Sequence, residues 1–347
     1  MWSPALAGLL ATDLKDLIAG IVSRPYRAFS APADGTAAAV IDEVSTAELK
    51  GEVDALPATQ RLVDSGCFHV YWARAGQIPR VLQEIGRLRE LTFRAVGEGS
   101  GKASDIDVFD TYYLHMFVWD EHANLIVGAY RLGLVDEILA QHGKRGLYTC
   151  SLFKYRSRML DMLNPAIELG RSFVRAEYQR SFAPMRLLWC GIARVIERSP
   201  QYAVLFGPVS ISNSYSPASR QLMVDYLSTH TAETRLRSQV KPRRPFRHER
   251  SDVASNSEAS FPASFDELSR MIAQIEPDHK GVPVLLRQYL RLGGRILAFN
   301  LDRKFGNVLD GLIMVDVRQI EPTMLARYMG KSGTMRFRAY HALGPSA

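Results

Sequence analysis

Residues 105–132, DIDVFDTYYLHMFVWDEHANLIVGAYRL, and residues 167–174, IELGRSFV, decide how this chain folds. Aromatic and β-branched residues dominate segments 112–119 and 125–132, which predicts two strands. Only the residues DEHAN separate these segments, so the pattern predicts a β-hairpin. The charged residues of this stretch, Glu168 among them, are costly to bury without partners. They therefore either neutralise one another or line a cleft.

Segments with regular periodicity surround this stretch on both sides. Helix patterns lie at 78–96, 185–197, 217–228, 264–274, 283–292 and near 322–343. Further strand patterns lie at 67–74, 167–174, 202–211, 295–300 and 312–317. The run 202–211 is almost entirely apolar, which is typical of a strand buried on both faces. This order of elements predicts an α/β chain with a mixed sheet.

The chain divides into four predicted parts. Residues 1–62 hold a linker and an amphipathic helix, which either packs on the body or lies on a membrane surface. Residues 63–234 form the core, and residues 263–347 complete it with further helices and strands. Between them, residues 235–262 are rich in Arg, Pro and Ser, which predicts a basic and mobile insertion. Three glycines within 97–101 predict a mobile loop.

Composition narrows the class of protein. The 347 residues carry a formal net charge of +7, which favours an anionic membrane surface, a nucleic acid or an acidic carrier protein as partner. Nucleic-acid binding is disfavoured because few aromatic residues accompany the basic segment. Three dispersed cysteines argue against disulfides and a zinc cluster, so no metal is expected. The absence of a long apolar run and of a clear signal peptide predicts a cytoplasmic protein, with peripheral contact at the inner membrane as an alternative.

Four short motifs follow one another along the chain: Arg89-x3-Phe93, Asp105-x-Asp107-x2-Asp110, Gly128-x2-Arg131-Leu132 and Glu168-x2-Arg171-x-Phe173-Val174. This order resembles the acyl-homoserine-lactone synthases and the related acyl-carrier-protein-dependent amino-acid N-acyltransferases. The latter include the ornithine and glycine lipid synthases, sometimes labelled putative hemolysins. The resemblance implies a GNAT-like (acyl-CoA N-acyltransferase) fold, here with an N-terminal helix and a C-terminal extension. It also implies the transfer of an acyl group to an amine.

The resemblance also implies the kind of acyl donor. An acetyl-CoA-dependent GNAT protein carries the pattern Q/R-x-x-G-x-G/A, whose backbone N–H groups bind the pyrophosphate at a helix N-terminus. The corresponding residues 179–184, QRSFAP, contain no glycine, and Pro184 lacks an N–H donor. An acyl-phosphopantetheine arm on an acyl-carrier protein is therefore the expected donor and partner. Acyl-CoA is the alternative donor, and no tightly bound cofactor is expected.

Aminolysis of a thioester sets the roles that the motif residues are expected to fill. The reaction requires a base for the amine proton, carboxylates near the ammonium and donors for the oxyanion. Glu168 is the predicted base, with Asp110 and Arg171 as further catalytic candidates. Asp107 and Asp110 would hold the ammonium, while Arg131 or Arg171 would bind an acceptor carboxylate. Structural ion pairs and loop capping are the alternatives for these residues.

Other side chains extend the candidate substrate-binding site. Arg89 and Phe93 lie about one helical turn apart and would face the acceptor together, although Phe93 also suits a core position. Ser210, Asn213 and Tyr215 follow the apolar strand. These three would bind the pantetheine amides or protonate the leaving thiolate, with turn and cap chemistry as their alternative.

The spacing of Glu168 and Arg171 raises a question of geometry. On a regular strand, side chains three residues apart point to opposite faces. Both residues can face one cleft only if the strand bulges, and Gly170 between them tolerates a bulge. GNAT folds resemble such an arrangement, because they splay two neighbouring strands to admit the donor arm.

The sequence therefore predicts an N-acyltransferase of lipid biosynthesis that moves a long acyl chain from a carrier protein to a small amine, with an amino acid as the expected acceptor. Two alternatives stay open. One is a signal synthase that resembles the acyl-homoserine-lactone synthases. The other is a non-catalytic GNAT-like protein that binds lipid or a membrane.

Overall fold

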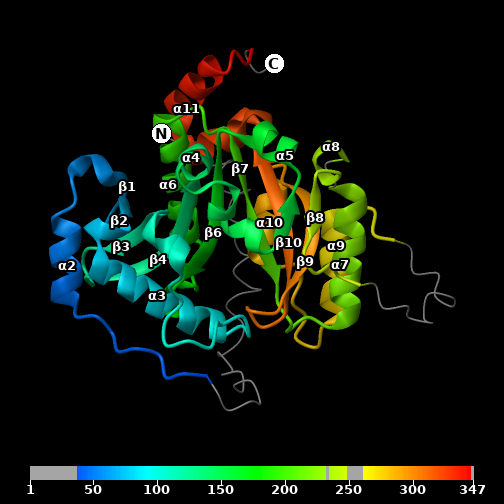
Figure 1. Ribbon diagram of the computed structural model, residues 1–347, viewed down its shortest axis with the longest axis horizontal. Coiled ribbons are helices and arrows are strands. Elements are labelled where there is room, and N and C mark those ends of the chain that lie inside the picture. Colours follow the sequence, from blue (N-terminus) through cyan, green and yellow to red (C-terminus); the bar gives the residue numbers. More distant parts are fainter. Residues whose placement is uncertain (1–36, 232–233, 248–260, 345–347) are drawn as a thin grey trace, which may run out of the picture.

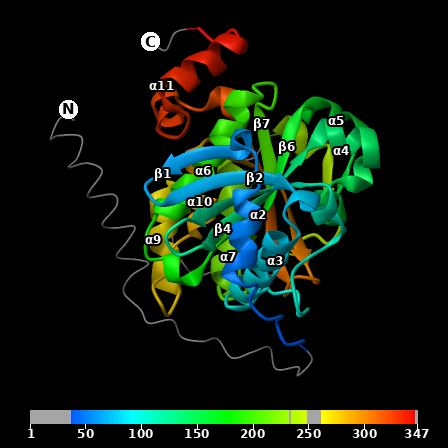
Figure 2. The ribbon, with the colours of Figure 1, turned by 90° about the vertical axis from the view of Figure 1, so that its left-hand side faces the viewer.

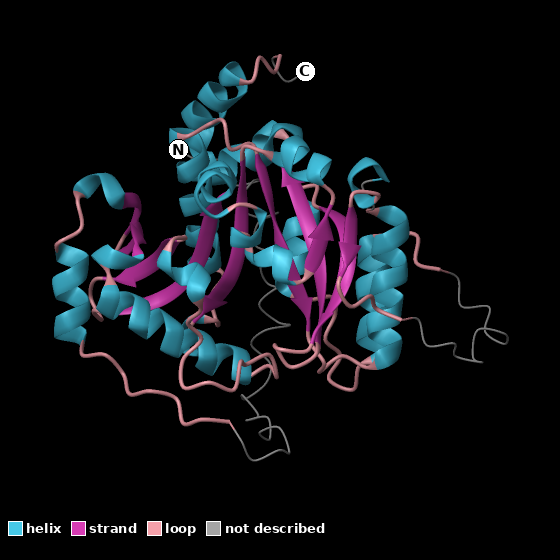
Figure 3. Cartoon of the chain, in the orientation of Figure 1, coloured by secondary structure: helices cyan, strands magenta, loops and turns pink. Residues whose placement is uncertain are grey.

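The computed structural model describes residues 37–231, 234–247 and 261–344 of the chain. The helix predicted near the N-terminus and the serine-rich end of the basic segment lie outside these residues. The described residues form one large sheet with helices on both faces (Figure 1). Figure 3 shows how the strands run through the middle of the molecule between these helices.

The sheet has eight strands in the order β1-β2-β3-β4-β6-β7-β10-β9. These strands are β1 (Arg61–Ser65), β2 (Phe68–Arg74), β3 (Leu114–Asp120), β4 (Leu125–Leu134), β6 (Ala166–Val174), β7 (Val204–Ile211), β9 (Arg295–Asp302) and β10 (Val308–Asp316). Neighbouring strands of this sheet are antiparallel, except β6 and β7, which run parallel. The sheet confirms the predicted mixed α/β class, and the predicted hairpin is β3 and β4.

Helices precede, connect and follow these strands. They are α2 (Thr46–Asp54), α3 (Pro79–Arg94), α4 (Val135–His142), α5 (Ser157–Leu163), α6 (Ala183–Arg198), α7 (Pro217–His230), α8 (Thr234–Arg237), α9 (Phe265–Ile275), α10 (Val284–Arg291) and α11 (Pro322–Tyr340). Two further strands, β5 (Phe153–Tyr155) and β8 (Val240–Pro242), form a small second sheet. The sequence patterns did not predict β1, β5, β8, α2, α4, α5 or α8.

The 16-residue helices α3 and α6 pack on opposite faces of the sheet. Helix α3 begins at Pro79, where the missing N–H costs nothing, and its buried side shares a hydrophobic cluster with Phe117 and Trp119 of β3. Helix α6 belongs to the cluster that contains Met116 and Val118. Because alternate residues of a strand point to opposite faces, the two clusters lie on either side of β3.

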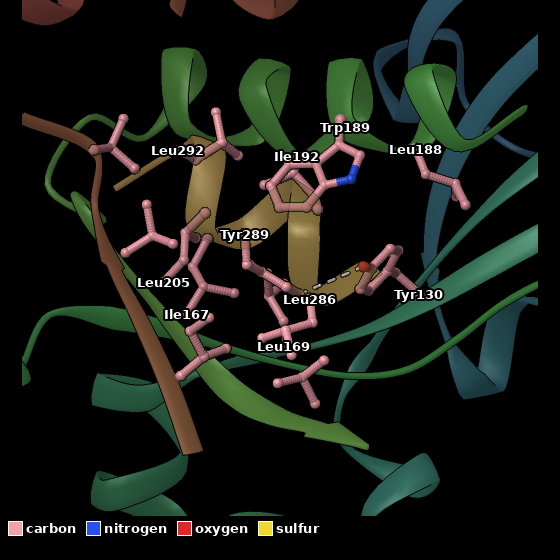
Figure 4. Packing of buried hydrophobic residues seen from close by; sticks show 14 of the residues in the cluster. Tyr130, Ile167, Leu169, Leu188, Trp189, Ile192, Leu205, Leu286, Tyr289 and Leu292 are labelled. Carbon is pink, nitrogen blue, oxygen red and sulfur yellow. Dashed lines mark hydrogen bonds between the residues drawn. The ribbon is translucent and has the colours of Figure 1, made fainter. Parts of the chain in front are cut away.

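Helix α10 completes the core on the α6 side of the sheet. Its Tyr289 meets Trp189 of α6 edge to face, with 5.1 Å between the ring centroids. The Tyr289 hydroxyl lies 3.4 Å from that of Tyr130 on β4 (Figure 4). Leu169 of β6 and Leu205 of β7 belong to the same cluster. The chain beyond residue 262 is therefore part of the core as well as of the sheet.

Helix α11 packs against α6 at one end of the molecule and is kinked at Gly330, where φ is 74°. Figure 2 turns the edge strand β1 and its neighbour β2 toward the viewer and shows α11 above them. In the described part of the chain, no helix combines the length and the apolar character needed to cross a membrane.

The first half of the basic segment is folded, which differs from the mobile insertion that the sequence predicted. Strand β8 pairs with β5 through Val240 and Tyr155. Pro245 then forms a β-bridge with Asn300 of β9, and the Asn300 side chain accepts a hydrogen bond of 2.8 Å from the Arg244 backbone N–H. These partners lie far away in the sequence, so charge and composition give no sign of them.

Candidate active site

Strands β6 and β7 pair over a short distance and then part. Their register comprises only Ala166↔Val204, Ile167↔Leu205 and Glu168↔Phe206, although both strands continue. The last close approach is at Gly207, where a Cβ atom would lie 2.0 Å from the Leu169 carbonyl oxygen. The sheet therefore opens into a gap that begins beside Glu168. This is the splay of neighbouring strands that the sequence resemblance implied.

A bulge in β6 brings Arg171 to the face that carries Glu168. The register with β4 shifts between Ala129 and Arg131, and Arg171 has a positive φ of 51°. As a result, both side chains meet Tyr148. The Tyr148 N–H donates to Glu168 over 3.0 Å, and the Arg171 guanidinium lies 4.9 Å from the centre of the Tyr148 ring. The predicted bulge is present, with the left-handed residue at 171 rather than at the glycine before it.

Three arginines and three aspartates of the candidate site form one buried ion network. The Arg89 guanidinium binds Asp110 through both terminal nitrogens, at 2.9 and 2.7 Å. Asp110 also lies 3.2 Å from Arg131, which in turn donates to Asp107 over 2.7 Å. The network continues through Arg171 Nε, which is 3.1 Å from an oxygen of Asp105. The structure therefore brings all the charged residues of the first three motifs together.

Asp110 lies at the centre of this network. A short 3-10 helix (Val108–Thr111) holds its carboxylate, which also accepts a hydrogen bond of 2.8 Å from the Asp107 backbone N–H. Burial alone would raise the pKa of Asp110, but the Arg89 and Arg131 guanidiniums outweigh burial and hold that pKa below its usual value. Both oxygens of Asp110 already have partners, so holding an ammonium would compete with the arginines. For Asp107 and Asp110 the predicted amine-binding role stays a prediction.

Aromatic rings surround the two arginines of the strands. Arg171 lies 4.6 Å from the centre of the Phe305 ring, and Phe305 meets Phe93 edge to face at 5.1 Å. Phe93 therefore packs against the ring that Arg171 contacts, and it belongs to the hydrophobic cluster that contains the buried side of α3. Arg131 lies over the rings of Tyr113 and Tyr148, each at 5.2 Å. Its Nη2 and Nε atoms are buried and have no hydrogen-bond partner, so this guanidinium keeps free donors.

Glu168 is tied to the segment that follows α4 rather than to an arginine. It accepts hydrogen bonds from the Tyr113 hydroxyl, from the Tyr148 N–H at 3.0 Å and from the Thr149 N–H at 2.7 Å. The side chain is buried, and burial raises its pKa against the opposing effect of these donors. In the described ranges Glu168 forms no ion pair with Arg131 or Arg171. The structure therefore does not contain the structural ion pair that was the alternative role for Glu168.

Ser210 reaches the site from the far side of the gap. It lies on the part of β7 that has separated from β6, and its hydroxyl donates to Glu98 over 2.8 Å. The sequence predicted a mobile glycine loop around Glu98. In the structure, buried Glu90 of α3 accepts hydrogen bonds from Ser100 and from the Gly101 N–H at 2.9 Å, which fixes this loop. Sequence reasoning therefore missed Glu98.

Asn213 and Tyr215 lie outside this cluster. Asn213 donates to the Gly306 carbonyl and accepts from Arg220 over 2.8 Å, so it joins α7 to the turn between β9 and β10. The Tyr215 hydroxyl donates to the Gly281 carbonyl over 2.7 Å. Their contacts are those of the turn and cap alternative. Within the described ranges, no group of His, Cys, Asp and Glu side chains is arranged to bind a metal ion.

Two grooves lie near the end of the sheet where β6 and β7 part. One has a volume of about 300 Å³ and lies between α3 and the segment after β6, lined by Leu88, Leu91, Val96, Arg175 and Gln179 among others. The other has a volume of about 680 Å³ and no acidic lining residue; its arginines are Arg220, Arg243, Arg244, Arg247 and Arg303. We call them the α3 groove and the arginine groove.

Comparisons with known proteins agree with this geometry. Residues 88–189 match the family model described as an acetyltransferase (GNAT) domain. A glycine N(alpha)-acyltransferase of Phocaeicola vulgatus is 30% identical over 255 residues, which cover 70% of this chain and 78% of that protein. One of Bacteroides thetaiotaomicron is 29% identical over 294 residues, covering 81% and 86%. No solved structure gives a significant match.

The parted strands and the buried site between them define an acyltransferase of the GNAT type. The chain belongs to the GNAT N-acyltransferases, the family of these two relatives.

Proposed function

We propose that this enzyme transfers a long acyl chain from an acyl-carrier-protein thioester to the amino group of a small amino acid, with glycine as the first candidate. The product would be an N-acyl amino acid that serves lipid biosynthesis. The name of the two relatives, glycine N(alpha)-acyltransferase, supports an amino-acid acceptor. The observation that carries the proposal is the gap between β6 and β7, because it opens beside the buried charged site.

The α3 groove suits the narrow arm of a phosphopantetheine donor. Apolar side chains of α3 line one wall, and residues just after β6 line the other. A thioester carried along this groove would approach the end of β6, where the strands have parted. The oxyanion formed there requires hydrogen-bond donors, and the unpaired strand edges offer backbone N–H groups.

The N-terminus of α6 supports a carrier protein over free CoA. The Ala183 N–H already donates to the Ser181 hydroxyl over 3.1 Å, and Pro184 has none. The Arg186 N–H donates to the Phe182 carbonyl over 3.0 Å. Few donors are left for a pyrophosphate, which normally needs several N–H groups at such a helix end. A carrier-linked arm has no pyrophosphate and therefore needs no such cradle.

The arginine groove supports an acidic protein partner. The Arg244 carbonyl accepts a hydrogen bond of 2.8 Å from the Leu301 N–H of β9, and the Arg243 side chain donates to the Cys150 carbonyl over 2.8 Å. Arg220 connects this groove to Asn213, and so to the turn at Gly306. A Cβ on Gly306 would lie 2.1 Å from the Gly97 carbonyl, so the groove borders the loop of Glu98. A carrier docked here would therefore present its arm near the gap.

Arginines of the site would recognise the acceptor's carboxylate. The buried Nη2 of Arg131 has no hydrogen-bond partner, and a carboxylate bound to it would make a charge-assisted hydrogen bond. The acceptor nitrogen would then attack the thioester carbonyl. The C–S bond breaks, and the thiolate takes up a proton and leaves as the thiol.

The test is a transfer assay with purified full-length protein, glycine and a hexadecanoyl chain on either acyl-carrier protein or CoA, read by mass spectrometry. We expect linear N-acylglycine, with a higher kcat/KM for the carrier-linked donor. A higher kcat/KM for acyl-CoA would overturn the donor assignment. No product from glycine, but product from another amine, would overturn the acceptor. A lactone product would instead support the signal-synthase alternative.

A further inference from the structure

A second set of carboxylates lies across the gap from the arginine network. Glu98, Asp302 and Asp310 are all buried, with exposed fractions of 7%, 7% and 6%. Glu98 follows α3, whereas the two aspartates lie on β9 and β10. None of the three belongs to the motifs that carried the family resemblance.

Strand register places Glu98 and Asp310 on either side of Ser210. Asp310 of β10 is the cross-strand partner of Ser210 of β7, so their side chains leave the sheet on the same face as near neighbours. The Ser210 hydroxyl donates to Glu98 over 2.8 Å. On the next strand, Asn300 is the partner of Asp310, and Asp302 lies two residues further on the same face.

These carboxylates lack counter-charges of their own. In the ion network, three arginines are matched by three aspartates. Among the described residues, none forms an ion pair with Glu98 or Asp310, and none donates a hydrogen bond to the Asp310 carboxylate. A buried carboxylate without a partner is costly, so the arrangement favours a cation that the chain does not supply. A primary ammonium brings one positive charge and three N–H donors.

The pKa shifts of Glu98 and Asp310 agree with the lack of a counter-charge. Burial raises the pKa of Glu98 to about 7, while the Ser210 hydrogen bond and Arg171 oppose the rise. Burial also raises the pKa of Asp310, and the charges of Asp302 and Glu98 raise it further against Arg171. A carboxyl group that titrates near neutral pH is suited to exchange a proton with an amine.

We propose that Glu98 takes the proton from the acceptor's ammonium, and that Asp310 holds this ammonium against Ser210 at the edge of the gap. The inference rests on the proposed function and names the catalytic residue of that same site. The ammonium gives one proton to the Glu98 carboxylate, and the free amine attacks the thioester carbonyl. The nitrogen loses its second proton as the C–S bond breaks and the thiolate becomes a thiol. Glu98 then returns its proton to water.

This role differs from the one that the sequence predicted for Glu168. Both oxygens of Glu168 already accept hydrogen bonds, from the Tyr113 hydroxyl and from the Tyr148 and Thr149 N–H groups. Among the residues that the structure describes, Ser210 is the one hydrogen-bond donor to Glu98, and it binds one of the two carboxylate oxygens.

The test compares Glu98→Gln with the wild-type enzyme in the glycine assay over a range of pH. Wild-type kcat/KM is expected to rise with pH and level off above about 7, following ionisation of Glu98. Glu98→Gln keeps the size and the acceptor for Ser210, and we expect it to lower kcat by about 10²–10⁴-fold. Its remaining activity should keep rising with pH, because it depends on free amine from solution. Glu98→Asp should recover part of the loss.

Asp310→Asn and a distant exposed carboxylate serve as matched comparisons. Asp310→Asn is expected to raise the KM for glycine more than it lowers kcat, whereas Glu121→Gln at the β3–β4 turn should change neither. If Glu98→Gln has the kcat and the pH profile of the wild-type enzyme, the inference about Glu98 is overturned. The proposed function would still be supported in that case, because the wild-type enzyme acylates glycine. Wild-type protein without transfer from either donor would overturn the proposed function itself. Thermal unfolding of each variant separates loss of fold from loss of chemistry.

Discussion

Glu168 and Arg171 lie on one face of β6 although they are three residues apart, because the strand bulges between them. Tyr148 joins the two side chains: its N–H binds Glu168 and its ring lies under Arg171. The bulge therefore couples the segment after α4 to the ion network. Changes at either residue are expected to act through Tyr148 as well as directly.

Glu168→Gln is expected to lower the free energy of unfolding by about 1–3 kcal/mol, because its amide NH2 replaces one carboxylate oxygen and cannot accept the hydrogen bond that this oxygen receives from Tyr148 or from Thr149. It is also expected to reduce kcat less than Glu98→Gln does. Denaturant unfolding and steady-state kinetics of both variants measure this. A larger loss of kcat in Glu168→Gln with unchanged stability would instead support Glu168 as the base.

Asp110→Asn is expected to destabilise the fold by roughly 3–5 kcal/mol, because it leaves Arg89 and Arg131 buried without full compensation. Urea unfolding measures the effect. The exposed Lys50–Asp54 pair on α2 provides the control: Asp54→Asn should cost no more than about 1 kcal/mol. If both variants lose stability equally, the network contributes no more than a surface pair.

The pH dependence of stability should report Glu98. Its pKa in the folded chain is about 7, above the ordinary 4.5, so the unfolded chain releases this proton first as pH rises. The stabilisation is therefore complete below about pH 4.5 and lost as pH rises to about 7, by roughly 2–3 kcal/mol. Glu98→Gln should lose less stability than the wild type over this window. Parallel unfolding curves for the two proteins would contradict the raised pKa.

Charge reversal of Arg243, Arg244 and Arg247 to Glu tests the arginine groove. We expect a higher KM for the carrier-linked donor, with a larger increase at low salt than at high salt and a nearly constant kcat. Reversal of the exposed Arg327 and Lys331 on α11 is the control and should leave this KM unchanged. Lost vesicle binding with an unchanged donor KM would assign the groove to a membrane instead.

Sequence patterns predicted the long elements and the order of the motifs because these depend on local periodicity. Strand β1 escaped prediction, since only Leu62 and Val63 are strongly apolar within it. Helices α4 and α5 are too short for a stable periodic pattern. The mixed sheet, the bulge and the grouping of the charged motif residues followed from spacing and chemistry.

The candidate site was predicted only where its residues carry a local signal. Glu98 lies among glycines, which indicated a mobile loop, and its burial depends on Ser210, more than a hundred residues away. Tyr215 follows Ser210 closely in sequence, yet the chain turns after β7 and takes its hydroxyl to Gly281. Contacts between distant segments decided both cases, and no pattern within one segment contains them.

The brief pairing of β6 and β7 gives the sheet a mechanical property. Strands β1, β2, β3, β4 and β6 form one antiparallel blade and strands β7, β10 and β9 form another; the strand pairing between the two blades is Ala166↔Val204, Ile167↔Leu205 and Glu168↔Phe206. Drawing the far ends of β6 and β7 further apart would therefore break no hydrogen bond within the sheet, and its cost would fall on the side-chain packing that the two blades share.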